Sequence, residues 1–180
     1  DKETAQIMVK EVERINRSIA QLLEFAKPMA VEKKRVDLKE VIEHSLKLVH
    51  QDLVKKNIKA TIQIATQNKE ILTDGDRINQ VLLNLYINAI QALEDNGSLD
   101  IDVRDSENLS QIEIRVKDNG SGIDSTLMDQ VFDPYFTTRS TGTGLGLSIV
   151  HRIIENLGGQ IRVESKKGEG TCFIILLPVQ

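Results

Sequence analysis

The sequence predicts an α+β fold, a two-layer sandwich in which helices cover one face of a mostly antiparallel mixed sheet. Three observations lead to this prediction. Four stretches show the apolar spacing of helices, four short stretches alternate apolar with polar residues and a fifth is a short apolar run, and the helices and strands follow each other in an order typical of such sandwiches. A chain of 180 residues suffices for one domain with an appendage, without disulfides or a structural metal.

The first helix is predicted over residues 8–26, where apolar residues recur in alternating steps of four and three. Pro28 would end it, because proline lacks an N–H and restricts the residue before it. A lone helix of this length is marginal in water, so its seam needs a partner helix in another subunit or in a segment outside this sequence. Packing against the chain's own domain is the alternative. The seam consists of Met8, Val12, Ile15, Ile19, Leu22 and Ala26.

The next elements follow a charged linker at residues 32–35. Asp37 followed by Glu40 resembles a capping box that opens a second helix. Residues 58–65 alternate as a half-buried strand does. An Asp-Gly-Asp turn at residues 74–76 then leads into a third helix of about 18 residues.

The second half of the chain completes the sheet and contains one long irregular connection. Residues 119–143 are rich in Gly, Asp and Thr and contain only a short helix near 124–132, and connections of this length are usually functional lids or disordered. A fourth helix should run from about 145 to 157 and end at the following glycine pair. The remaining strands are predicted around 101–103, 112–116, 160–165 and 171–177.

Composition excludes several classes of function. The formal net charge is -4 and no basic stripe is present, so nucleic acid is not expected as a partner. The single Cys172 can neither form an internal disulfide nor complete a metal site, and we expect a small buried hydrophobe in a reducing compartment. No apolar run reaches the roughly 18 residues of a membrane helix, which predicts a soluble chain. The chain starts at Asp1 inside a helical pattern, so we expect a longer parent protein.

Two asparagines provide the first candidate chemistry. Asn84 and Asn88 are four residues apart on the third helix, so their side chains point the same way, at the margin of its buried stripe. An asparagine oxygen is a neutral ligand for a hard cation such as Mg²⁺. Alone, the pair could equally be solvated surface.

Two glycine-containing segments suggest nucleotide binding. Asp118 ends a strand and precedes Gly120 and Gly122, and a carboxylate held there can accept a hydrogen bond from the exocyclic amine of adenine. Residues 142–147 open the fourth helix with three glycines, an arrangement that offers free backbone N–H groups to phosphates. The first segment could be a simple strand-to-turn junction and the second a flexible linker. Neither a P-loop nor a dinucleotide fingerprint is present.

The ordered set of segments resembles the sensor histidine kinases of two-component systems, in the nitrogen-regulation-like branch of the GHKL superfamily. The resemblance covers residues 37–178. Residues 84–89 resemble the asparagine box, 118–122 the first glycine box, 132–136 the phenylalanine box, and 142–147 the second glycine box. It implies the Bergerat ATP-binding fold over residues 31–180. Residues 1–30 would be the second helix of a partial dimerisation and phosphotransfer domain.

The resemblance also implies roles for individual residues. Asn88 would ligate a Mg²⁺ that bridges the ATP phosphates, Asp118 would recognise the adenine amine, and Thr171 would lie near the base through a water. Residues 123–143 would form the ATP lid, with Phe132 and Phe136 pinning it or serving as plain hydrophobic anchors. The full set expected to bind ATP is Asn84, Asn88, Asp118, Gly120, Gly122, Thr138, Arg139, Gly142, Thr143, Gly144, Leu145, Gly146 and Thr171.

The implied activity is transfer of the γ-phosphoryl from Mg-ATP to a histidine. In related ATPases a glutamate at position 84 activates water; an amide cannot accept that proton, so hydrolysis should be slow. His44, His50 and His151 are not followed by an acidic residue, as the phosphoacceptor would be, so this fragment should not phosphorylate itself. Departures from the family are Arg139 in place of Lys and Gln91 in place of a basic residue.

The implied partners are ATP, a second copy joined through the N-terminal helix, and a response regulator, for which the resemblance suggests the enhancer-binding type. The fragment would lie in the cytoplasm, with an inner-membrane anchor of the parent left open. Two alternatives remain. One is another GHKL enzyme, against which Asn84 and the N-terminal helix argue, and the other is a non-catalytic nucleotide-binding or dimerisation module.

Overall fold

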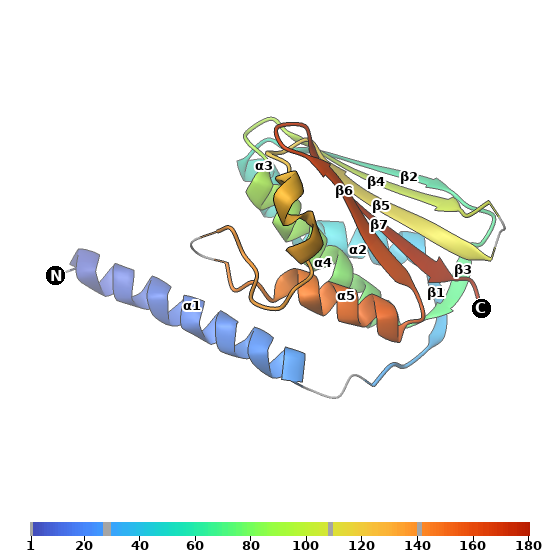
Figure 1. Cartoon of the computed structure of the whole chain (residues 1–180), viewed down its shortest axis with the longest axis horizontal. Helices are drawn as coiled ribbons and strands as arrows, with labels where there is room; N and C mark the ends of the chain where they lie inside the picture. The colour runs from blue at the N-terminus through green and yellow to red at the C-terminus, as the bar shows by residue number, and fades with distance from the viewer. Residues whose placement is uncertain (1, 27–29, 108–109, 140–141) are drawn as a thin grey trace.

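The structure, a computed structural model, describes residues 2–26, 30–107, 110–139 and 142–180. Its helices are α1 (Lys2–Ala26), α2 (Leu38–Leu48), α3 (His50–Lys55), α4 (Gly75–Ala92), the 3-10 helix η1 (Ser125–Gln130) and α5 (Gly146–Asn156). Its strands are β1 (Lys34–Asp37), β2 (Lys59–Ala65), β3 (Glu70–Thr73), β4 (Ser98–Asp105), β5 (Gln111–Asp118), β6 (Gln160–Lys166) and β7 (Gly170–Pro178). Helices α2, α4 and α5 form one layer and the large sheet forms the other (Figure 1).

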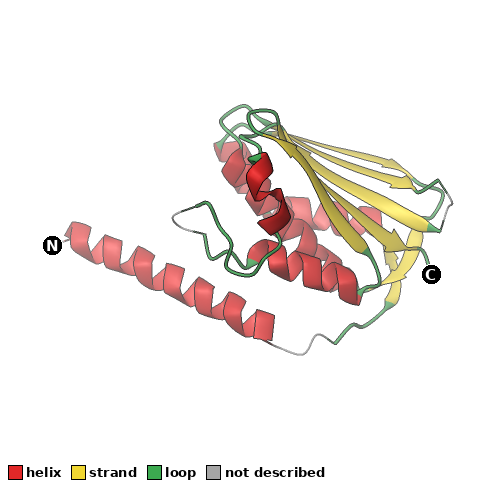
Figure 2. Ribbon diagram, in the orientation of Figure 1, coloured by secondary structure: helices red, strands yellow, loops and turns green. Residues whose placement is uncertain are grey.

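The large sheet has the strand order β2-β4-β5-β7-β6. Strand β2 runs parallel to β4, and the other three pairings are antiparallel, which confirms the mostly antiparallel mixed sheet. The parallel pairing requires a crossover between the two strands, and this crossover contains α4. Figure 2 shows how the helices gather on one face while the other face carries no helix.

The core lies between the two layers because the central strands alternate strictly. Alternate residues of β4 and β5 point toward the helices and are fully buried, and α4 presents a stripe that is buried to the same degree. Hydrophobic burial therefore fixes both the register of the strands and the rotation of α4 about its axis. The inward residues are Leu99, Ile101, Val103, Ile112, Ile114 and Val116, with Ile78, Val81, Leu82 and Leu85 from α4.

The uncovered face of the sheet is mostly polar, with Ile174 of β7 as a buried exception. Glu113 accepts hydrogen bonds from Arg104 Nε at 2.8 Å and Arg115 Nε at 2.6 Å. Cys172 points to this face and is only half-buried, so the expectation of a buried thiol was wrong. The cause is strand alternation, since Thr171 and Phe173 take the inward positions on β7.

The helix boundaries follow the predicted signals with some differences. The Asp37 carboxylate caps α2 by accepting from Lys39 N–H at 2.8 Å. Asp74 caps α4 by accepting from Arg77 N–H at 3.1 Å, and α4 has the predicted 18 residues. The charged linker prediction was wrong at its end, because Lys34 begins β1, which pairs with β3. Pro28 lies outside the described residues.

Helix α1 extends beside the sandwich and begins earlier than predicted (Figure 1). Its predicted seam faces solvent over the described side chains: Met8 is 64% exposed and Leu22 44% exposed. The alternative in which this seam packs against the chain's own domain does not hold for these residues. No helix among the described residues is long and apolar enough to cross a membrane.

Tyr86 on α4 is fully buried, yet its hydroxyl has no hydrogen-bond partner within ordinary geometry among the described residues. The Ser45 hydroxyl donates to the Ile42 carbonyl at 3.0 Å. Burial raises the pKa of Tyr86 to about 12, and the neighbouring Ser45 hydroxyl opposes this rise. An unpaired buried hydroxyl costs stability.

We therefore expect Tyr86→Phe to raise the free energy of unfolding by about 1 kcal/mol. Urea denaturation followed by circular dichroism measures this change. Tyr135→Phe is the matched control, because Tyr135 is 62% exposed and its hydroxyl is accessible to water. A loss of stability in the Tyr86 variant, with the control unchanged, would show that the hydroxyl is bonded after all.

Candidate nucleotide site

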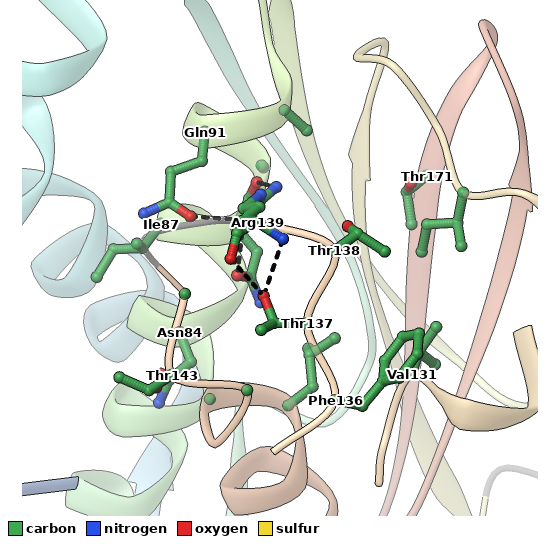
Figure 3. Close-up of a pocket in the computed structure, with 18 of the residues that line it drawn as sticks. Asn84, Ile87, Gln91, Val131, Phe136, Thr137, Thr138, Arg139, Thr143 and Thr171 are labelled. Carbon is green, nitrogen blue, oxygen red and sulfur yellow. Dashed lines mark hydrogen bonds between the residues drawn. The ribbon is translucent and has the colours of Figure 1, made fainter. Parts of the chain in front are cut away.

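A cavity of about 950 Å³ opens between α4, the end of β5, the described residues of 121–139 and 142–144, and the start of α5. Figure 3 shows the side chains that surround it, drawn from segments far apart in the sequence. One side carries the amides of α4, and the opposite side carries Thr171 of β7. The cavity is therefore polar at both ends, as a site for a nucleotide requires.

Asn84 and Asn88 both line the cavity, as their spacing predicted. Asn84 Nδ2 donates to the Gln80 carbonyl at 3.0 Å, which commits the donor end of the amide to the helix backbone. Its oxygen is the atom nearest to where a Cβ on Gly146 would lie, at 3.2 Å. Asn84 thus presents an acceptor to the first turn of α5.

Arg139 lies across this group of amides. Its Nη1 donates to Gln91 Oε1 at 2.5 Å and lies 3.4 Å from Asn88 Oδ1, and its Nη2 donates to the Asn88 carbonyl at 3.2 Å (Figure 3). Burial lowers the pKa of Arg139, and the carboxylate of Asp118 opposes this shift. A cation thus already stands beside the carboxamide oxygen of Asn88.

The position of Arg139 beside the Asn88 oxygen indicates whether Mg²⁺ fits the site. Among the described residues no group of three or more His, Cys, Asp or Glu side chains could hold a metal. Asn88 offers a neutral oxygen, and in this structure that oxygen already faces the positive charge of Arg139. Mg²⁺ accepts a neutral oxygen ligand when phosphates and water fill its other coordination positions. The residues present therefore fit a metal that arrives with its nucleotide.

Asp118 lies at the other end of the cavity and is only 4% exposed. Its Oδ1 accepts from Gly120 N–H at 2.8 Å. Burial raises the pKa of Asp118, while the N–H groups of Gly120 and Thr171 and the charge of Arg139 oppose the rise. The turn after β5 thus holds a carboxylate in a largely desolvated place, where a ligand that donates a hydrogen bond would be favoured.

Ser165 on β6 was missed by sequence reasoning. Its Oγ accepts from Ile123 N–H at 2.8 Å, donates to the Gly170 carbonyl at 2.8 Å and lies 2.9 Å from Thr171 Oγ1. Strand alternation was the available signal, because Ser165 follows Ile161 and Val163 on the inward face of β6. Its importance depends on its pairing with Thr171, which a single sequence does not reveal.

Helix α5 begins at Gly146 without a side-chain cap, in contrast to α2 and α4. Gly142, Thr143, Gly144 and Gly146 line the cavity at this end. The free N–H groups of the first turn and the positive end of the helix dipole therefore make a site for an anion.

The aromatic residues of the predicted lid divide between two roles. Phe132 packs against His151 at a ring-centroid distance of 5.3 Å and against Phe173 at 6.4 Å. Phe136 instead lines the cavity. The first anchors the segment to α5 and β7, and the second contributes to the cavity wall.

Most of the predicted site residues come together around this one cavity. Two do not line it. Leu145 is 2% exposed and packs in the core, and Gly120 supports Asp118 from behind the cavity wall. The predicted residues that do line it are Asn84, Asn88, Asp118, Gly122, Thr138, Arg139, Gly142, Thr143, Gly144, Gly146 and Thr171.

Comparison with known proteins identifies relatives of this arrangement. Residues 73–180 match the family described as histidine kinase-, DNA gyrase B-, and HSP90-like ATPase. The sensor histidine kinase ZraS of Escherichia coli K12 is 46% identical over 97% of this chain and 37% of its own length. The chain thus spans well under half of that relative.

Two solved structures resemble the fold. The catalytic domain of the histidine kinase ThkA superposes with a TM-score of 0.72 at 36% identity, covering 82% of this chain and 96% of that one. ThkA in complex with the response regulator TrrA gives a TM-score of 0.79 at 32% identity, covering 97% of this chain and 50% of that one. The chain therefore belongs to the histidine kinase-, DNA gyrase B- and HSP90-like ATPase family, and within it resembles the catalytic domains of sensor histidine kinases.

Proposed function

We propose that residues 31–180 bind ATP with Mg²⁺ and donate its γ-phosphoryl to a histidine on a dimerisation helix of the longer protein. One observation carries the proposal: the uncapped start of α5 opens onto a cavity that Asn84 and Asn88 also line, with the Asn84 oxygen beside Gly146. An anion site faces neutral oxygen ligands there, as phosphates and their metal require.

The phosphates would lie against Gly142, Gly144 and Gly146 and accept from the backbone N–H groups of the first turn of α5, while the Gly142 N–H donates to the Arg139 carbonyl. Mg²⁺, when bound, supplies positive charge that offsets the charge of the phosphates. Arg139 would leave Asn88 and Gln91 and donate to phosphate oxygens, since a guanidinium binds them with a planar pair of donors. Asn84 would present its oxygen as a hydrogen-bond acceptor beside the phosphates. Its amide cannot act as a base, so it would activate water poorly. The γ-phosphoryl is therefore kept for another nucleophile.

The adenine would lie at the Asp118 end. The carboxylate would accept from its amine, and Gly122 keeps the adjoining turn close to β6. The described parts of 123–143 would form the lid over the nucleotide, with Phe132 holding it to α5. Positioning and charge stabilisation then account for the chemistry that this domain contributes.

The exposed seam of α1 supports residues 1–30 as part of a dimerisation and phosphotransfer domain, with a second copy of the chain as partner. A helix with this much exposed apolar surface is stable only when paired. ThkA has been solved with a response regulator, which supports a receiver of that class here. We propose the enhancer-binding type on the resemblance to the nitrogen-regulation-like branch alone. ATP is the proposed ligand, so we propose that this part of the protein lies in the cytoplasm.

Titration calorimetry with ATP, with and without Mg²⁺, tests the metal site. We expect Asn88→Ala to weaken Mg-ATP binding at least about tenfold, or 1.4 kcal/mol, and to leave the weaker binding of metal-free ATP unchanged. Asn156→Ala is the control, because Asn156 is an exposed helical asparagine whose Nδ2 donates to the Arg152 carbonyl. Equal losses with and without Mg²⁺ would contradict the role assigned to Asn88.

Phosphoryl transfer requires a second experiment. The chain would be joined to a preceding helix that carries a phosphoacceptor histidine and incubated with radiolabelled Mg-ATP. Acid-labile, base-stable label on that histidine is expected. Tight ATP binding without any label would favour a non-catalytic nucleotide-binding module.

A further inference from the structure

We infer that Ser165 sets the hydrogen-bond polarity of Thr171, so that the base end of the cavity presents only acceptors and selects a 6-amino purine over a 6-oxo purine. This inference rests on the proposed nucleotide function. It concerns a residue outside the glycine and asparagine segments, on a strand that contributes no residue to the cavity lining.

The number of protons at Ser165 Oγ determines the direction of each of its hydrogen bonds. Ser165 Oγ has one proton and three close polar neighbours: the Ile123 N–H, the Gly170 carbonyl and the Thr171 hydroxyl. The Ile123 N–H can only donate, and the Gly170 carbonyl can only accept. Two oxygens 2.8 Å apart need a proton between them, so the serine proton points at Gly170.

The orientation of Thr171 follows from that assignment. Thr171 Oγ1 lies 2.9 Å from Ser165 Oγ, and the serine has no second proton to give. The threonine must therefore donate to the serine. Its single proton points away from the cavity, and its lone pairs remain for whatever lies beside it. The opposite assignment would leave Ser165 Oγ and the Gly170 oxygen in contact without a proton.

Asp118 and Thr171 are paired across β5 and β7, so their side chains lie side by side on the same face. The carboxylate of Asp118 is also an acceptor. A ligand edge that meets both must donate, directly or through a water, and an exocyclic amine has two hydrogens to give. A carbonyl at the same place would face two acceptors and lose a hydrogen bond at each.

Ser165 also holds the first residue of the predicted lid through the Ile123 N–H. A structural effect on the lid must therefore be separated from an effect on polarity. The Thr171→Val variant separates the two effects, because it has no hydroxyl for Ser165 to orient.

The test compares the affinities of ATP and inosine triphosphate, which differ in the amine or carbonyl at C6. Wild type should prefer ATP. Ser165→Ala releases the Thr171 proton, and we expect the preference to fall at least about threefold, mainly through tighter binding of inosine triphosphate. Ser165→Thr keeps the hydroxyl and should restore the wild-type ratio. Ser165→Cys, a weak donor, should give an intermediate ratio and replaces the alanine variant should that variant not fold.

The double variant decides the mechanism. In the Thr171→Val background, Ser165→Ala should leave the ratio of the two affinities unchanged within twofold, although both affinities fall if the lid is loosened. A change in ratio that persists in this background, or no change in the single variant, overturns the inference while ATP binding by wild type keeps the proposed function. If wild type binds neither nucleotide, the proposed function itself is wrong and the inference falls with it.

Discussion

Replacing Asp118 with asparagine is expected to weaken ATP binding about 10- to 100-fold while making the free domain more stable. The loss of affinity follows from removal of a charge-assisted hydrogen bond, worth about 1.5–3 kcal/mol. The gain in stability follows from burial: the carboxylate is 4% exposed, and its pKa is raised because burial disfavours the charged form. Asn keeps an oxygen that can accept from Gly120 N–H.

The sign of the pH dependence follows from the raised pKa. Between the ordinary value of 3.8 and the higher value in the folded protein, the folded state holds more protons at Asp118 than the unfolded state. The contribution of Asp118 to the free energy of unfolding therefore falls as pH rises through that window, and this loss of stability is complete at neutral pH. The advantage of Asp118→Asn should accordingly shrink as pH falls through the window.

Two measurements check these expectations. Calorimetry at pH 7 gives the ATP affinity of wild type and Asp118→Asn, and urea unfolding at several pH values gives their stabilities. As pH is lowered, the ATP affinity of wild type should begin to fall at a pH above the ordinary pKa of an aspartate. A variant that is less stable than wild type at pH 7 would show that the carboxylate is well solvated or compensated in the free domain.

Replacing Gly122 with alanine is expected to lower the free energy of unfolding by about 3 kcal/mol or more. Gly122 has a φ of +66°, and a Cβ there would lie 2.0 Å from the carbonyl oxygen of Lys166. Both are backbone features, so no side-chain rotation can relieve the clash. The turn after β5 would have to move away from β6.

Gly168→Ala is the matched control for this prediction. Gly168 lies in the opposing turn, where its N–H donates to Ser121 O at 2.7 Å, and it also has a positive φ, +83°. A Cβ at that position would meet nothing within 4 Å. We expect a loss of about 1 kcal/mol from backbone strain alone. Equal losses in the two variants, measured by urea unfolding, would mean that the close approach to Lys166 is absent.

Much of the fold could be predicted from the sequence because the strongest patterns belong to the core. The stripe of α4 and the alternation in β4 and β5 are buried almost completely, so periodicity and burial agree. The pair β1 and β3 was missed because each strand has four residues, too few for alternation to stand out among charged neighbours. Cys172 was misplaced because an apolar run hides which residues of a strand face inward.

The candidate site shows the same division. Asn84 and Asn88 could be predicted because helical spacing alone places them on one side. The sequence of residues 142–147 does not distinguish Leu145 from the glycines that line the cavity. Only the fold shows that its side chain enters the core. Ser165 and Gln91 act through Thr171 and Arg139 on other segments, and those contacts depend on strand register and on where residue 139 lies.

The position of β7 has a consequence for how the chain reaches its native state. Residues 170–178 come last among the strands, yet they lie between β5 and β6 in the sheet. During synthesis, β6 has no strand to pair with until β7 has left the ribosome, and the exposed edge of β5 must wait for it. Thr171, at the base end of the cavity, arrives with that same strand. The proposed nucleotide site is therefore completed after nearly all of the domain has been translated, and early binding of ATP cannot guide the assembly of this half of the sheet.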